Sequence, residues 1–350
     1  MDHRWLKFQC PDCAVPIPQE QDEERKCPSC KRLFEERDGI FYALPTAVEN
    51  ARVKEREKEG WQRLLGHWDD AQRSLLLNLP FAEGTELDSI HYRQAAREFS
   101  FAREYLSPIE GKRGLDLGGQ TGWAAYRFAQ LDAEMVCVDY NECAKAGLRA
   151  GDVYLQKGIH FDRICADAES LPLAENQFDF VYSSAFLHHL PNPGVAVRHV
   201  SRVLKPGGVY FATLEAFCPF WMTRRRALRR CDMAQEFISQ GINEQVFYMR
   251  EYERWFREAG LSLEVVNPRW DRVEKGRVIP NWLVGRNGYL PEILENRRES
   301  AGLIGIAARI VLRSEFWRLF SGPGSFGLLR RRLLSGTQKF RILIGHKKQV

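Results

Sequence analysis

Short apolar runs alternate with amphipathic segments through the middle of this 350-residue chain. Residues 113–117 and 135–138 have the length and composition of strands, and residues 121–130 between them carry apolar positions at helical spacing. Strands that alternate with helices are typical of a parallel sheet with helices on both faces, so the pattern predicts an α/β fold. Further strands are predicted at 161–166, from Asp179 onward, at 209–217 and at 261–266, with a helix at 250–258.

The first predicted strand runs into a glycine-rich turn, Gly-Leu-Asp-Leu-Gly-Gly-Gln-Thr-Gly at 114–122, before the first helix. Glycine lets a backbone pass close to a ligand, and the start of a helix offers unpaired N–H groups to a carboxylate. Asp116, just before the turn, is placed to hold an ammonium group. A ligand that carries both a carboxylate and an ammonium would satisfy both features.

Three more motifs follow in order: Val-Asp-Tyr at 138–140, Ala-Asp-Ala-Glu-Ser-Leu-Pro-Leu at 166–173 and Lys-Pro-Gly-Gly at 205–208. Asp139 closes the second strand, where ligands bind in open α/β sheets, and its carboxylate can accept from both hydroxyls of a ribose. The four motifs together resemble those of the class I S-adenosylmethionine-dependent methyltransferases, in the branch of the ubiquinone and menaquinone methyltransferases. The resemblance covers about 110–266 and the last dozen residues.

This resemblance implies a Rossmann-like sheet of seven strands, six parallel and one antiparallel, with helices on both faces and S-adenosylmethionine as cofactor. It also implies that Asp167 accepts from the exocyclic amine of adenine. Where the family usually has Asp-x-Gly-x-Gly-x-Gly, Gln120 replaces the middle glycine; retained cofactor binding is favoured over a blocked site. An NAD site is disfavoured, because the glycines do not form G-x-G-x-x-G. The cofactor-binding residues expected are Asp116, Gly118, Gly119, Gln120, Gly122, Asp139, Tyr140, Asp167, Ala168 and Ser183.

Methyl transfer depends mainly on alignment of donor and acceptor, and a base is needed only if the acceptor loses a proton. His188 and His189 follow the fourth strand, and histidine titrates close to neutral pH, so either can act as that base. A positional role for both histidines is the alternative. Glu215, at the tip of the fifth strand, is the third catalytic candidate.

Two Cys-x-x-Cys pairs near the N-terminus, Cys10 with Cys13 and Cys27 with Cys30, are separated by thirteen residues. This spacing suits one zinc ion held by four thiolates, a closed and therefore structural site. Disulfides are the alternative, but the residues before Cys10 lack the apolar core of a secretory signal, which favours metal in a reducing compartment.

The net charge of +5 is unevenly distributed, since residues 267–350 contain 17 Lys or Arg against 6 Asp or Glu. Within them, 300–334 has the pattern of a basic amphipathic helix, which suits either peripheral membrane contact or packing on the enzyme with a solvated face. No uncharged run there is long enough to span a bilayer. The predicted parts are a zinc ribbon at 1–45, a helical cap at 46–108, the catalytic core at 109–266, an insertion at 267–338 and the last core strand at 339–350.

These features predict a cytoplasmic enzyme that transfers methyl groups from S-adenosylmethionine to a small-molecule, lipid-linked or glycan acceptor. One alternative is a methyltransferase of ribosomal or transfer RNA, favoured by the ribbon and the basic tail. A second is a non-catalytic module that binds S-adenosylmethionine or a partner protein.

Overall fold

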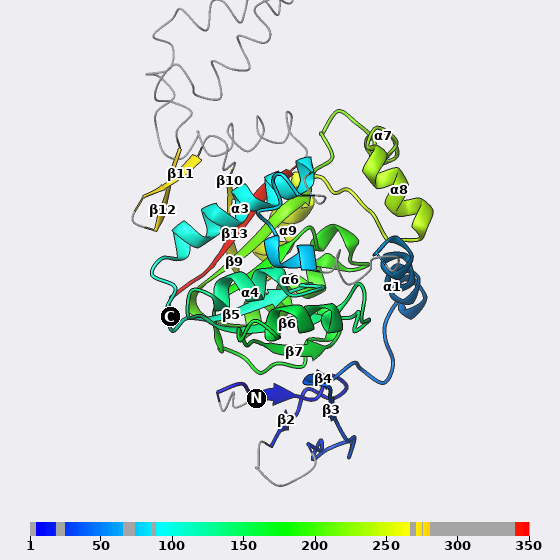
Figure 1. The fold of residues 1–350 in the computed structure, drawn as a ribbon, viewed down its shortest axis with the longest axis vertical. Coiled ribbons are helices and arrows are strands. Elements are labelled where there is room, and N and C mark those ends of the chain that lie inside the picture. The colour runs from blue at the N-terminus through cyan, green and yellow to red at the C-terminus, as the bar shows by residue number, and fades with distance from the viewer. Residues whose placement is uncertain are drawn as a thin grey trace, which may run out of the picture.

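The computed structural model describes residues 5–18, 25–65, 74–85, 89–266, 271–274, 276–280 and 340–349. Their centre is a nine-stranded sheet with helices packed on both faces (Figure 1). The strand order is β10-β13-β9-β8-β5-β6-β7-β4-β3. These strands are β3 (Glu35–Arg37), β4 (Ile40–Tyr42), β5 (Arg113–Leu117), β6 (Glu134–Asp139), β7 (Asp162–Cys165), β8 (Phe178–Ser184), β9 (Leu204–Ala216), β10 (Leu261–Val266) and β13 (Phe340–Lys347).

The predicted core consists of seven of these strands, which lie side by side in the order β10-β13-β9-β8-β5-β6-β7. Strands β5 to β9 pair in parallel, and β13 pairs antiparallel with both β9 and β10, so β13 alone runs against the other six. The prediction of six parallel strands and one antiparallel strand is confirmed. Because both faces are covered by helices, these strands are nearly continuous apolar runs.

Two groups of buried side chains fill the two sides of the sheet. Strand β6 contributes to both, with Val136 and Val138 in one cluster and Met135 and Cys137 in the other, as the alternation of side chains along a strand requires. One side is covered by α6 (Pro193–Val203) and α9 (Met249–Glu258), and the other by α3 (Ile90–Leu106), α4 (Trp123–Ala129) and α5 (Asp152–Leu155).

The fifth core strand begins earlier than predicted. The strand was predicted at 209–217, after the motif at 205–208, but β9 already begins at Leu204. The pairing with β8 shifts between Phe178 and Phe180, and Gly207 has a φ of +79°. The Lys-Pro-Gly-Gly motif is therefore an irregularity within the strand, where a positive φ favours glycine.

The N-terminal segment extends the same sheet. Strands β1 (Phe8–Gln9) and β2 (Pro16–Ile17) form a hairpin, while β3 pairs with β4 and β4 pairs in parallel with β7. Leu6, Phe8 and Phe41 belong to the same buried cluster as α6 and α9. The residues predicted as a ribbon thus share both the sheet and the core of the larger domain.

Helix α1 (Ala51–Leu65) and helix α8 (Asp232–Gln240) lie together beyond the carboxyl ends of the parallel strands, at the right of Figure 1. The rings of Trp61 and Phe237 are 5.3 Å apart and join the two helices. The short α7 (Arg224–Arg229) precedes α8. The segment predicted as a helical cap, which precedes β5, therefore meets the segment that follows β9 over the same edge of the sheet.

The predicted insertion before the last strand is described only in part. Strands β11 (Asp271–Glu274) and β12 (Arg277–Pro280) form a hairpin. The predicted basic amphipathic helix at 300–334 lies outside the described residues. Among the helices that are described, none combines the length and the apolar character needed to cross a bilayer.

Candidate active site

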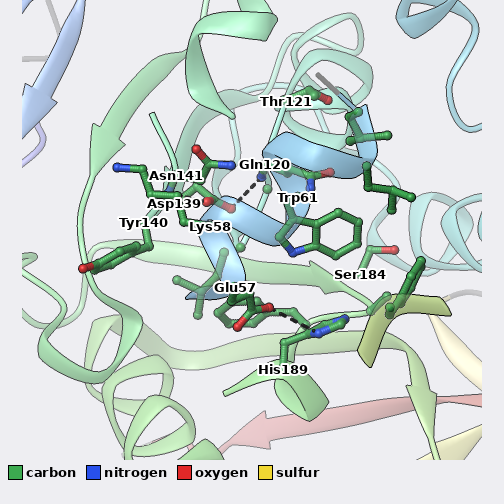
Figure 2. Close-up of a pocket in the computed structure, with 18 of the residues that line it drawn as sticks. Glu57, Lys58, Trp61, Gln120, Thr121, Asp139, Tyr140, Asn141, Ser184 and His189 are labelled. Carbon is green, nitrogen blue, oxygen red and sulfur yellow. Dashed lines mark hydrogen bonds and ion pairs between the residues drawn. The ribbon is translucent and has the colours of Figure 1, made fainter. Parts of the chain in front are cut away.

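A cavity of about 420 Å³ lies at the carboxyl ends of β5, β6, β7 and β8 (Figure 2). Asp116, Asp139 and Asp167, which follow three neighbouring strands, all line it. Helix α1 forms the opposite wall with Glu57, Lys58 and Trp61. The volume and the mixture of apolar walls with a few polar groups are typical of a small-molecule site.

The glycine-rich turn packs too closely for larger residues at two positions. A Cβ on Gly119 would lie 2.6 Å from Asp116 Oδ2, and one on Gly118 would lie 2.0 Å from the Phe186 ring. Gly118 also has a φ of +69°. Neither position accepts a side chain, and both glycines line the cavity with their backbone.

The two carboxylates beside the turn are held by backbone donors. Asp116 Oδ2 accepts from the Ala125 N–H at 3.0 Å, and Asp139 accepts from the N–H groups of Gln120 at 2.8 Å and Asn141 at 2.7 Å. Burial raises the pKa of Asp116 to about 7 and that of Asp139 to about 6. A cationic ligand would favour the charged form of both groups.

Gln120, which replaces the usual glycine, has a φ of +51°. A non-glycine residue in the left-handed region carries about 1–3 kcal/mol of strain. We expect Gln120→Gly to raise the free energy of unfolding by about 1 kcal/mol and to leave donor affinity undiminished, measured by urea unfolding and calorimetry.

Gln156 is a matched control, because it is exposed and has a φ of −61°. Gln156→Gly should lower the free energy of unfolding by about 0.5–1 kcal/mol, since no strain is relieved there. Equal losses of stability in the two variants would contradict a strained Gln120.

Asp167, predicted to contact adenine, is paired with a lysine from α1. Lys54 Nζ lies 2.7 Å from Asp167 Oδ2 and 2.9 Å from Glu169 Oε2, and Lys54 is only 6% exposed. Tyr140 is likewise tied to α1, because its hydroxyl donates to Glu55 Oε1 at 2.5 Å. Both contacts join residues far apart in sequence, and no motif indicated them.

Ser183 and its neighbour Ser184 differ in their placement. Ser183 is fully buried, and its hydroxyl forms a hydrogen bond with that of Tyr210 at 2.9 Å. Ser184 lines the cavity, as does Ala168. Because successive side chains of β8 point to opposite faces, Ser184 takes the place in the cavity that was predicted for Ser183.

His188 lies in the short helix η4 (Leu187–His189) with a carboxylate behind it. His188 Nδ1 is 2.9 Å from Glu215 Oε2, and Glu215 also accepts from the backbone N–H of Leu187 and from the Tyr252 hydroxyl. Burial opposes protonation of His188, but the Glu215 and Glu244 carboxylates outweigh it and raise its pKa to about 9. Glu215 is fully buried and, among the described residues, is not part of the cavity wall. It therefore positions η4 and His188.

His189 faces two carboxylates that were not predicted as site residues. His189 Nδ1 lies 3.3 Å from Glu57 Oε1 of α1, and His189 Nε2 lies 3.7 Å from Glu244 Oε2 (Figure 2 shows the first contact). Burial raises the pKa of Glu57 to about 8. No motif surrounds Glu57 or Glu244, so only the folded arrangement reveals them.

The four predicted zinc ligands lie close together in the N-terminal segment. Their sulfur atoms all lie within 4.8 Å of one another, with Cys10 Sγ 3.7 Å from Cys30 Sγ and Cys13 Sγ 3.4 Å from Cys27 Sγ. Four thiolates about 2.3 Å from a tetrahedral zinc would be about 3.8 Å apart. The donor set therefore fits one zinc ion.

Comparison with known proteins agrees with the sequence motifs. Residues 115–212 match the Methyltransferase domain family. The chain contains a class I S-adenosylmethionine-dependent methyltransferase domain, as its sheet topology and sequence motifs also indicate.

The sequence relatives within that class include an uncharacterized chloroplastic methyltransferase of Arabidopsis thaliana, 30% identical over 164 residues, which cover 43% of this chain and 45% of the relative. The ubiquinone biosynthesis O-methyltransferase of Alkalilimnicola ehrlichii is 28% identical over 166 residues, 47% of this chain and 66% of the relative. The chain thus spans about half to two thirds of the length of these two relatives.

Among solved structures, a phosphoethanolamine N-methyltransferase of Haemonchus contortus in complex with S-adenosylmethionine is similar with a TM-score of 0.48 and 18% identity, covering 87% of this chain and 62% of that one. The [4+2]-cyclase SpnF is similar with a TM-score of 0.49 and 19% identity, covering 88% and 99%.

Proposed function

We propose that this protein transfers a methyl group from S-adenosylmethionine to a hydroxyl group of a small-molecule acceptor. The observation that carries this proposal is the shared cavity, in which Asp116 and Asp139 flank the glycine-rich turn while His188 and His189 lie at the same cavity wall. The names of several sequence relatives, which are ubiquinone biosynthesis O-methyltransferases, support a hydroxyl acceptor.

The donor would be held mainly by charge and by hydrogen bonds. Asp116 would attract the ammonium of the methionyl group, and Asp139 would accept from the ribose hydroxyls while its backbone donors keep it in place. The Lys54 ammonium already occupies one oxygen of Asp167, so adenine would meet a carboxylate that is partly neutralised. These contacts would orient the sulfonium, and alignment supplies most of the rate of an in-line displacement.

On the acceptor side, the chain offers a base that is held in place. Glu215 orients His188 through Nδ1, which leaves Nε2 of the same ring directed toward Glu244 and the cavity. Trp61 packs edge-on against the His189 ring, with centroids 5.8 Å apart. A hydroxyl acceptor would lose its proton to the neutral form of the His188 ring as the methyl group arrives. Because the pKa of His188 is raised to about 9, this form becomes more abundant as the pH rises toward that value.

We also propose that Cys10, Cys13, Cys27 and Cys30 hold one structural zinc ion. The support is the close approach of the four sulfurs and the matching hydrogen bonds of the two turns, where Ala14 N–H donates to the Cys10 carbonyl and Lys31 N–H to the Cys27 carbonyl. Zinc would stabilise a segment with little core of its own.

Calorimetry with S-adenosylmethionine tests the proposed function. The parent chain should bind one donor molecule, and Asp139→Ala should bind it about 100-fold more weakly, because two hydrogen bonds to a charged acceptor are lost. Glu110→Ala, which removes an exposed carboxylate outside the cavity, should bind like the parent. Absence of binding heat with the folded parent chain would refute the proposal.

A further inference from the structure

A second group of possible metal ligands lies in the cavity itself. One ligand atom from each of His188, His189 and Glu244 lies within 4.8 Å of the other two. Glu244 Oε2 is 3.9 Å from His188 Nε2 and 3.7 Å from His189 Nε2. These separations are too long for hydrogen bonds. They are close to the roughly 3.0–3.5 Å expected between two ligands that bind one ion at about 2.1 Å.

The oxygen at the centre of this group has no hydrogen-bond partner. Glu244 Oε2 is buried and has no hydrogen bond, only the longer contacts with the two imidazoles, and the Glu244 side chain is only 9% exposed. A buried, unpaired carboxylate oxygen costs several kcal/mol of solvation unless something cationic satisfies it. A cation between Glu244 and the two imidazoles would do so.

Each histidine also has a carboxylate behind its other ring nitrogen. Glu215 Oε2 lies 2.9 Å from His188 Nδ1, and Glu57 Oε1 lies 3.3 Å from His189 Nδ1. The contact with Glu215 is a hydrogen bond of the kind that sets the orientation and the tautomer of a histidine that binds metal. His189 Nδ1 makes no hydrogen bond, and Glu57 contacts it only as a nearby carboxylate. The Nε2 atoms of both rings lie nearest to Glu244 Oε2.

The charged side chains around the group also favour a bound cation. Three carboxylates, Glu57, Glu215 and Glu244, surround two imidazoles in a region where every one of these side chains is at most 17% exposed. Two nearby lysines, Lys54 and Lys58, pair with other acidic residues, Lys54 with Asp167 and Glu169 and Lys58 with Glu142. A divalent cation would be attracted to the carboxylates on this side of the cavity.

We propose that His188, His189 and Glu244 bind one divalent transition-metal ion, such as zinc, iron(II) or manganese, inside the cavity. Two imidazoles and one carboxylate suit these metals, and three protein ligands leave coordination positions open. All three residues line the cavity that Asp116 also lines, so the open positions face the space available to the acceptor. If the proposed function holds, a hydroxyl oxygen of the acceptor would bind there and lose its proton to solvent more readily. With metal bound, His188 would be a ligand through Nε2 and would not act as the base.

Manganese(II) is a suitable probe, because it favours carboxylate oxygen over the four thiolates near the N-terminus. The full chain, with zinc supplied to its cysteines, is titrated with manganese(II) while free ion is followed by electron paramagnetic resonance. We expect one manganese per chain, displaced by excess zinc. Glu244→Gln and His189→Gln should each weaken binding at least about tenfold.

Glu236→Gln is the matched control, because Glu236 lines the same cavity from an exposed position on α8 and is not part of the group. It should bind manganese like the parent. If the parent binds neither manganese nor a second zinc, or if both Glu244→Gln and His189→Gln bind manganese normally, the metal site is refuted; where one variant fails to fold, the other decides.

Calorimetry with S-adenosylmethionine on the same samples separates the two proposals. Donor binding without metal binding would overturn the metal site alone, and metal binding without donor binding would overturn the proposed function alone.

Discussion

Cys27→Ser is expected to lower the free energy of unfolding of the whole chain by more than about 3 kcal/mol. Structural zinc contributes roughly 10–16 kcal/mol of apparent folding free energy in small modules, and Cys27 is a fully buried member of the proposed ligand set. Urea unfolding measures the loss, and atomic emission measures the zinc content. We expect both to fall together.

The effect should reach the donor site because the N-terminal segment is built into the catalytic domain. Strand β4 pairs with β7, and the Lys7 carbonyl accepts from the Ala174 N–H at 3.0 Å, directly after the 166–173 motif. A chain without zinc should therefore also bind S-adenosylmethionine more weakly.

Cys143→Ser is the control, since Cys143 is a partly buried thiol outside the cluster. It should change the free energy of unfolding by less than about 1 kcal/mol. Parent-like stability and zinc content in Cys27→Ser would show that the four cysteines do not hold a structural metal.

The core strands and the three aspartates could be predicted because each depends on local sequence. A buried parallel strand is a continuous apolar run, and Asp116 and Asp139 stand at the ends of such runs. For the same reason the sequence could not distinguish Ser183 from Ser184. With both faces of β8 buried, no alternation of polar and apolar residues indicates which serine faces the cavity.

The wall formed by α1 could not be predicted, because its contacts join distant parts of the chain. Lys54, Glu57 and Trp61 lie in a strongly polar helix, and charged residues in such a helix usually form a solvated face. Only the packing of α1 against α8 buries them beside Asp167 and His189. Glu244, in the loop after α8, could not be predicted as a site residue either, because contacts with distant parts of the chain place it in the cavity.

The pairing of the N-terminal segment with the central sheet could not be predicted from the sequence either. Two Cys-x-x-Cys pairs predict a compact unit by themselves. Strand β4 is only Ile40–Tyr42, and such a short run carries no information about a partner more than a hundred residues away.

Glu215→Ala is expected to lower the free energy of unfolding by about 3–5 kcal/mol. The carboxylate accepts from four donors, the N–H groups of Phe186 and Leu187, His188 Nδ1 and the Tyr252 hydroxyl, and truncation leaves these donors without it in a buried site. Glu264→Ala is the matched control, because Glu264 pairs with His346 at 3.5 Å but is 34% exposed. That change should cost less than about 1 kcal/mol in urea unfolding.

Glu215→Gln separates the positioning of His188 from overall stability. Glutamine keeps one oxygen for the two backbone donors, but its amide nitrogen would face His188 Nδ1 and act as a donor. His188 would then carry its proton on Nε2, the nitrogen that points toward Glu244. We expect a loss of stability of about 1 kcal/mol, near-normal donor binding and a lower pKa of His188, because the Glu215 charge is lost. Above that pKa, we expect a change of tautomer visible in nitrogen NMR of the imidazole. An unchanged tautomer would mean that Glu215 supports the fold of η4 without orienting the histidine.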